Sequence, residues 1–140
     1  MSERAVATML FAMLIAAGQQ SVSVVIAMRH PAMRSSLWAV VQGDSGLRPL
    51  GAAPDVRDTM RLLHYAQPEV VLVDSAILGE RDLQRLPTLR AAAPDAVFIV
   101  LGMGDHPAYA VHARKAGAYD YIRFDEAAER LPETIRAAQR

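Results

Sequence analysis

The sequence predicts an α/β protein built on a doubly wound parallel sheet, and three observations lead to this prediction. Short apolar runs of the kind found in buried strands recur along the chain. Between them lie stretches whose apolar residues return at helical spacing. The connections are short, so successive strands should pair in parallel through right-handed crossovers, with helices on both faces. The length of 140 residues suits a single domain.

The first two strand–helix units are predicted within residues 24–63. An apolar strand covers Val24–Ala27, and Pro31 suits the first turn of the helix that follows. A weaker strand over Leu47–Ala52 contains Pro49, which cannot donate a ladder hydrogen bond, so we expect this strand at the edge of the sheet. Asp55 then begins a helix whose inward face carries Val56, Met60 and Leu63.

The other three units complete the alternation. Strands are predicted over Val70–Val73, Val97–Leu101 and Tyr119–Ile122. Pro87 should kink or shorten the helix of its unit, and Pro132 should sit in the first turns of the last helix. The helices are predicted over Arg81–Ala93, Pro107–Ala116 and Glu126–Ala138. Five strands and five helices in alternation suit the flavodoxin-like strand order 2-1-3-4-5.

Composition excludes several classes of function. The chain has no Cys, which excludes disulfides, thiolate metal sites and Cys nucleophiles and fits a cytoplasmic protein. Fifteen basic residues balance fifteen acidic ones, so direct nucleic-acid binding by this domain is not expected. The histidines lack metal-ligand spacing and are interpreted as structural or surface residues: His30, His64, His106 and His112.

Residues 1–20 form an amino-terminal extension ahead of the α/β domain at residues 21–140. Residues 5–18 carry no charge, yet this run is too short to span a bilayer. We favour a helix that packs on this domain or on a partner chain. Membrane-surface attachment by residues 5–18, an export signal and a misassigned start codon are the alternatives. The candidate contacts of this helix are Met9, Leu10, Met13 and Leu14.

Asp74 is the most informative single residue. It closes the strand Val70–Val73, and the carboxyl end of such a strand faces the crevice where open α/β folds place their ligands and chemistry. A phosphoacceptor at this place needs further carboxylates nearby to hold Mg²⁺. The candidate partner positions are not acidic. This indicates a signalling domain that has kept the α/β fold but has lost most of the residues needed to accept a phosphoryl group.

Three stretches, within a match from about Ser23 to Gln139, resemble the receiver domain of bacterial response regulators. VVIAMRHPAMR is similar to the family's first strand and helix start, and VVLVDSAILG to its phosphoacceptor strand and loop. VFIVLGMGDHPAYAVHARKAGAYDYIRFD resembles the fourth strand through the fifth. The likeness is strongest to the branch whose receivers precede a helix-turn-helix output domain. It implies two-component signal transduction, phosphorelay and transcription regulation, with a histidine kinase or an output domain outside this chain as candidate partners.

The resemblance implies a set of reactive positions, most of which have changed. Asp74 matches the phosphoacceptor and Tyr121 the aromatic switch. The remaining positions of the family's pocket fall on Met28 and Arg29 (the acidic pair), Gly102 (the hydroxyl) and Phe124 (the lysine). Arg29 would repel a cation and is expected to pair with the Asp74 carboxylate. One carboxylate holds Mg²⁺ poorly, so we expect weak or absent Mg²⁺ binding, no other metal site and no cofactor.

The favoured function is that of a degenerate receiver, a pseudo-receiver, which is not an enzyme and acts by binding protein partners or as a homodimer. The family dimerises through its fourth helix, fifth strand and fifth helix. On this face the candidate contacts, not all of which can point the same way, are Lys115, Asp120, Arg123 and Arg130.

Three alternatives stay open. Asp74 can be an active phosphoacceptor with unusual metal handling. The vacated pocket can bind a small anion such as a phosphorylated metabolite, with Arg29 as its cation and backbone N–H groups of Gly102 and Gly104 approaching it. The chain can also resemble the receiver-like domain of a pilus-localisation ATPase, which a P-loop downstream would reveal. These 140 residues contain no P-loop.

Overall fold

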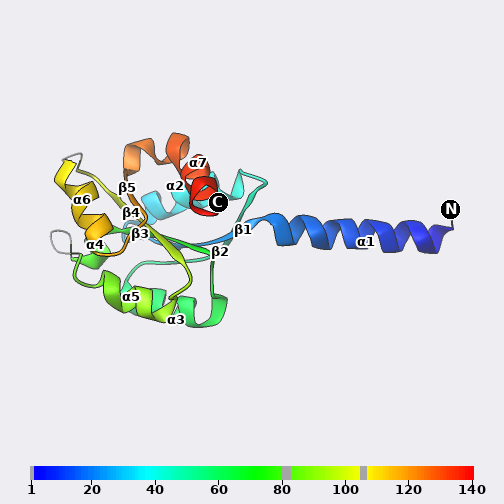
Figure 1. Cartoon of the computed structure of the whole chain (residues 1–140), viewed down its shortest axis with the longest axis horizontal. Coiled ribbons are helices and arrows are strands. Elements are labelled where there is room, and N and C mark those ends of the chain that lie inside the picture. Colours follow the sequence, from blue (N-terminus) through cyan, green and yellow to red (C-terminus); the bar gives the residue numbers. More distant parts are fainter. Residues whose placement is uncertain (1, 80–82, 105–106) are drawn as a thin grey trace.

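The computed structural model describes residues 2–79, 83–104 and 107–140, and for residues 14–20 it describes the backbone alone. The described chain forms one five-stranded parallel sheet in the order β2-β1-β3-β4-β5. Helices cover both faces of this sheet (Figure 1). The predicted doubly wound, flavodoxin-like architecture is confirmed.

The elements have the following bounds. The strands are β1 (Val22–Ala27), β2 (Leu47–Ala53), β3 (Val70–Asp74), β4 (Val97–Gly102) and β5 (Asp120–Arg123). The helices are α1 (Glu3–Gln20), α2 (Pro31–Gln42), α3 (Val56–Ala66), α4 (Ser75–Leu78), α5 (Leu86–Ala92), α6 (Pro107–Lys115) and α7 (Ala127–Ala138), with a 3₁₀ turn, η1 (Phe124–Glu126), before α7.

Two apolar layers hold the helices on the sheet. Successive strand residues point to opposite faces, so each central strand supplies both layers. On one face α3, α4, α5 and α6 pack against strand residues that include Val71 and Phe98. On the other face α2 and α7 pack against Ile26, Leu72 and Ile99. The continuous apolar runs of the sequence are explained by this burial on two sides.

The edge position predicted for the strand with Pro49 is confirmed, since β2 is the first strand of the sheet. Pro49 pairs with Val24, and the register between β1 and β2 then shifts so that Val25 pairs with Gly51. Leu50 is the extra residue of this β-bulge. The irregularity follows from Pro49, which has no N–H to give to the ladder.

Pro87 and Pro132 both lie near the beginning of their helices. α5 begins at Leu86, which places Pro87 in its first turn, where the missing N–H costs no helical hydrogen bond. The start predicted at Arg81 lies outside the described residues. Pro132 lies inside α7, in its second turn. α4, a single turn directly after β3, was not predicted.

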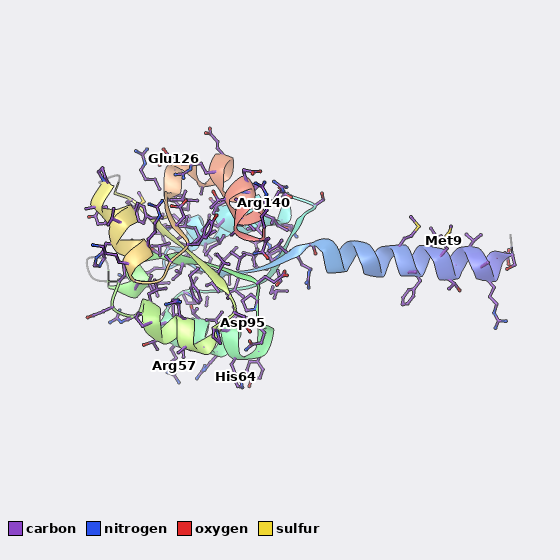
Figure 2. The ribbon with its side chains drawn as sticks, in the orientation of Figure 1. Met9, Arg57, His64, Asp95, Glu126 and Arg140 are labelled. Atoms are coloured by element: carbon purple, nitrogen blue, oxygen red, sulfur yellow. The ribbon has the colours of Figure 1, made fainter. Side chains whose placement is uncertain are left out.

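α1 projects away from the α/β domain (Figure 1), and the Met9 side chain on this helix is exposed (Figure 2). Ser2 caps its start by accepting a hydrogen bond of 3.1 Å from the Ala5 N–H. Over the part of the chain that the structure describes, no helix is long and apolar enough to cross a membrane. The side chain of Leu14 lies outside the described part. The exposed apolar residues at one helical spacing are Val6, Met9, Leu10 and Met13.

Candidate functional site

Asp74 ends β3, and both of its carboxylate oxygens already accept backbone hydrogen bonds. Oδ1 accepts from the Ala76 N–H at 3.0 Å and so caps α4. Oδ2 accepts from the Arg29 N–H at 3.2 Å. The side chain therefore joins the connection after β3 to the connection after β1. This half-buried carboxylate has a structural role, because it satisfies backbone N–H groups of both connections.

Arg29 contacts Asp74 through its backbone, not through its guanidinium. Among the described residues no ion pair joins the two side chains, so the charge-assisted pair expected from the sequence is not formed. The Arg29 side chain instead lines a neighbouring cleft together with Arg57 and Arg85. The physical reason is that the Arg29 N–H faces Asp74, while the exposed side chain leaves the backbone in another direction.

The other positions of the family's pocket hold residues without a polar side chain. Met28 is 1% exposed and belongs to the apolar layer that also contains Leu37. Phe124 begins η1 and packs against the same layer. Gly102 ends β4 and is buried. These three positions therefore offer Asp74 neither a metal ligand nor a cation.

Tyr121 lies over Gly102, in the space that a side chain at position 102 would take. A Cβ on Gly102 would come within 2.9 Å of Cε2 and Cζ of the Tyr121 ring. The Tyr121 hydroxyl donates a hydrogen bond of 2.8 Å to the carbonyl of Gly104. The ring also stacks on Tyr109, with centroids 5.7 Å apart and an interplanar angle of 21°. The missing side chain at position 102 is thus what admits the ring.

The space beside Asp74 is small and largely covered by these rings. It amounts to about 240 Å³, and its described lining includes Asp74, Ser75, Tyr109 and Tyr121. Asp74 contributes the carboxylate of this described lining. In residues 2–79, 83–104 and 107–140, no group of three His, Asp or Glu side chains could hold a metal ion. The rings also stand over the turn of Gly102 and Gly104. This argues against the small-anion site that was one of the alternatives from the sequence.

The candidate contacts on α6, β5 and α7 lie in three separate places. Asp120 lies 3.0 Å from Arg114 and 3.7 Å from Arg130, measured between charged nitrogen and oxygen atoms. Arg130 also pairs with Glu126 at 3.2 Å. Lys115 lies apart from this network, in a shallow groove on α6 that is also lined by Tyr109, Val111 and His112.

Arg123 belongs to a different cluster. Its guanidinium donates two hydrogen bonds to Asp125, at 2.9 Å from Nε and 2.6 Å from the terminal nitrogen. The hydrogen bond from Arg123 lowers the pKa of Asp125. The expectation that the four charged candidates cannot all point the same way agrees with this separation.

Three residues near Asp74 were not identified from the sequence. Tyr109 fixes Tyr121, and Arg57 and Arg85 join Arg29 around one cleft. One signal could have revealed the arginines. Each follows the carboxyl end of a strand, β1, β2 or β3, and the carboxyl ends of parallel strands meet at one edge of the sheet.

Comparisons with known proteins agree with this geometry. The chain is 25% identical over 122 residues to the uncharacterized transcriptional regulatory protein YxjL of Bacillus subtilis, covering 87% of this chain and 56% of that protein. It is 24% identical over 115 residues to the response regulator GacA of Pseudomonas aeruginosa, covering 82% and 54%. The chain thus spans about half the length of the curated relatives it matches.

Solved structures show the same fold. The signal receiver domain of the putative response regulator NarL from Mycobacterium tuberculosis superposes with a TM-score of 0.71 at 22% identity, covering 86% of this chain and 94% of that one. The isolated REC domain of RcsB from Salmonella enterica serovar Typhimurium gives a TM-score of 0.76 at 19% identity, covering 85% and 88%. The profile of the response regulator receiver domain matches residues 24–136, which is most of the chain. With Asp74 at the end of β3 and Tyr121 on β5, this protein belongs to the response regulator receiver domain family of two-component signalling.

Proposed function

We propose that this receiver is a pseudo-receiver, which signals through protein contacts and without phosphorylation of Asp74. The observation that supports this most is the position of Tyr121 over Gly102. A receiver switch of the kind implied by the family needs a hydroxyl at position 102 that reports the phosphoryl group. Here that hydroxyl is replaced by a glycine, and the aromatic ring already occupies the space.

The chemistry of phosphoryl transfer supports the same proposal. The charge of the transferring group must be offset by a metal ion and by cationic side chains. Mg²⁺ prefers oxygen ligands in octahedral geometry. Met28 and Phe124 supply no such ligand or charge, and the Arg29 N–H already occupies one oxygen of Asp74. A phosphoryl group on Asp74 would also take up one of the two carboxylate oxygens, each of which accepts a backbone hydrogen bond.

We propose a second copy of this chain as the first partner, bound through the apolar face of α1. Met9, Leu10 and Met13 are 46%, 52% and 60% exposed on a helix that stands clear of the domain (Figure 1). Burying such a side chain stabilises an association by roughly 1–2 kcal/mol. Two projecting helices can meet along this face while the two α/β domains remain apart.

The surface of α6, β5 and α7 is a second proposed contact. Tyr109 and Val111 on α6 are 41% and 50% exposed, and Tyr119, directly before β5, is 45% exposed. The charged network around Asp120 lies on the same surface and includes Arg114 of α6 and Arg130 of α7. Apolar residues beside charged pairs are typical of a protein interface. Since the matched relatives are about twice as long, we propose an output domain or a histidine kinase of a cytoplasmic signalling pathway as the partner of this surface.

Light scattering coupled to size-exclusion chromatography tests the homodimer. Leu10→Glu/Met13→Glu should convert a dimer to a monomer, because it places two charges in the proposed contact. Thr8→Glu, which adds a charge on the opposite side of α1, should leave the dimer intact. Addition of beryllofluoride and Mg²⁺ should leave the mass of the wild-type particle unchanged. A monomeric wild type would contradict the α1 dimer, and a mass that changes with beryllofluoride would contradict independence from phosphorylation.

A further inference from the structure

A cleft of about 500 Å³ lies on the α3 side of Asp74, separate from the small space beneath Tyr121. Arginines from three connections line it: Arg29 after β1, Arg57 in the first turn of α3, and Arg85 just before α5. Figure 2 shows Arg57 at the end of α3 that is farther from α1. The rest of the lining is largely apolar and includes Pro54, Val56 and Ile77.

The three guanidinium groups lack carboxylate partners in the part of the chain that the structure describes. Arg29, Arg57 and Arg85 form no ion pair with any described residue, whereas six other arginines do, namely Arg61, Arg114, Arg123, Arg130, Arg136 and Arg140. Arg85 is held in place by a hydrogen bond of 3.1 Å to the carbonyl of Ile77. A neutral chain with fifteen charges of each sign therefore gathers unpaired positive charge at one cleft.

One carboxylate, that of Asp55, also lines the cleft. Its Oδ1 accepts a hydrogen bond of 2.8 Å from the Asp58 N–H and thereby caps α3. The cleft still carries three positive charges against one negative charge. The amino-terminal end of α3 adds the positive end of an eleven-residue helix dipole to the same place.

We propose that this cleft binds a small phosphate-bearing molecule. Guanidinium groups bind phosphate oxygens through paired, charge-assisted hydrogen bonds. A cleft of this volume with an apolar lining and a few convergent charged groups is of the kind that holds small ligands. The site shares Arg29 with the small-anion alternative of the sequence, but Arg57 and Arg85 take the place of the backbone N–H groups of Gly102 and Gly104.

The proposed ligand would give a pseudo-receiver a non-covalent input. Ala76 lines both the arginine cleft and the space beside Asp74. Arg29 places its side chain in the cleft and donates its N–H to Asp74. A ligand that holds Arg29 and the connection after β3 would therefore act on the same loops that a phosphoryl group reaches in a phosphorylated receiver. This inference goes beyond the pseudo-receiver function and does not depend on it.

Isothermal titration calorimetry of the full chain with inorganic pyrophosphate, at constant ionic strength and without Mg²⁺, tests the site. We expect saturable binding that Arg57→Gln weakens by roughly tenfold, as for the loss of one hydrogen-bonded charge. Arg29→Gln should weaken binding to a similar extent, because it also removes one guanidinium from the cleft. It keeps the backbone N–H that donates to Asp74, so that hydrogen bond should be unaffected. Arg61→Gln removes the same charge from α3 outside the cleft and should leave the affinity unchanged.

Three results would overturn the proposal. The first is the lack of saturable binding at millimolar pyrophosphate. The second is an equal loss in Arg57→Gln and Arg61→Gln, which would indicate attraction to the surface at large. The third is binding that is seen only in a repeat titration with Mg²⁺ and that disappears in Asp74→Asn, which would place the anion at the phosphoacceptor. That third result would also contradict the pseudo-receiver function, whereas the first two would leave it standing, so the two failures are distinguishable.

Discussion

Gly102→Thr should lower the free energy of unfolding by about 2–3 kcal/mol, because it overpacks the space that Tyr121 fills. Carbon atoms in contact lie about 3.5–4.0 Å apart, and the new Cβ would stand 2.9 Å from two ring carbons. The ring would have to leave, which would break the hydrogen bond from its hydroxyl to Gly104 and the stacking on Tyr109. Urea unfolding followed by circular dichroism measures the loss.

A double-mutant cycle separates this cause from a general effect on β4. In a Tyr121→Ala background the ring is gone, so Gly102→Thr should cost under about 1 kcal/mol there. Equal costs in both backgrounds would show that Tyr121 does not occupy this space in solution. The main support for the pseudo-receiver function, the position of Tyr121 over Gly102, would then be lost.

Asp74→Ala should also destabilise the domain, by about 2 kcal/mol, because two backbone donors lose their acceptor. These donors are the N–H groups of Ala76 and Arg29. The expectation follows from Asp74 as a structural residue that joins two connections. Chemical unfolding of the wild type and the variant, monitored by circular dichroism, provides the measurement.

Two comparison variants make the Asp74 result interpretable. Asp74→Asn keeps one acceptor oxygen, so its loss of stability should be smaller than that of Asp74→Ala. Asp95→Ala removes an exposed carboxylate that makes no hydrogen bond in the described chain, and it should be nearly neutral. If Asp74→Ala were as stable as the wild type, the carboxylate would have no structural task and would be free for phosphorylation.

The fold could be predicted from the sequence because burial on both faces leaves a strong pattern. The apolar runs of β1, β3 and β4 are central in the sheet, and Pro49 marks the edge strand. Alternation with short connections predicts parallel strands, and the order 2-1-3-4-5 was chosen as the flavodoxin-like order that suits five such units. α4 was missed because a single turn has too few residues to show helical spacing, and it depends on a cap from Asp74.

The site was only partly predictable, since side-chain direction is set by packing and not by residue type. The sequence placed Arg29 beside Asp74, which is where its backbone lies, but Arg29 forms no ion pair with Asp74 in the described chain and lines another cleft. Gly102 was identified as a missing hydroxyl, yet the entry of Tyr121 into its space depends on Tyr109 and on the carbonyl of Gly104. Arg57 and Arg85 line the same cleft as Arg29, because the carboxyl ends of the parallel strands that precede these arginines lie at one edge of the sheet.

The central claim is that Asp74 does not accept a phosphoryl group, and intact mass spectrometry after incubation with acetyl phosphate and Mg²⁺ tests it most directly. The wild type and Asp74→Asn should give the same unmodified mass at every Mg²⁺ concentration. A phosphate-sized adduct on the wild type that is missing from Asp74→Asn would contradict the pseudo-receiver function and restore a phosphorylation switch.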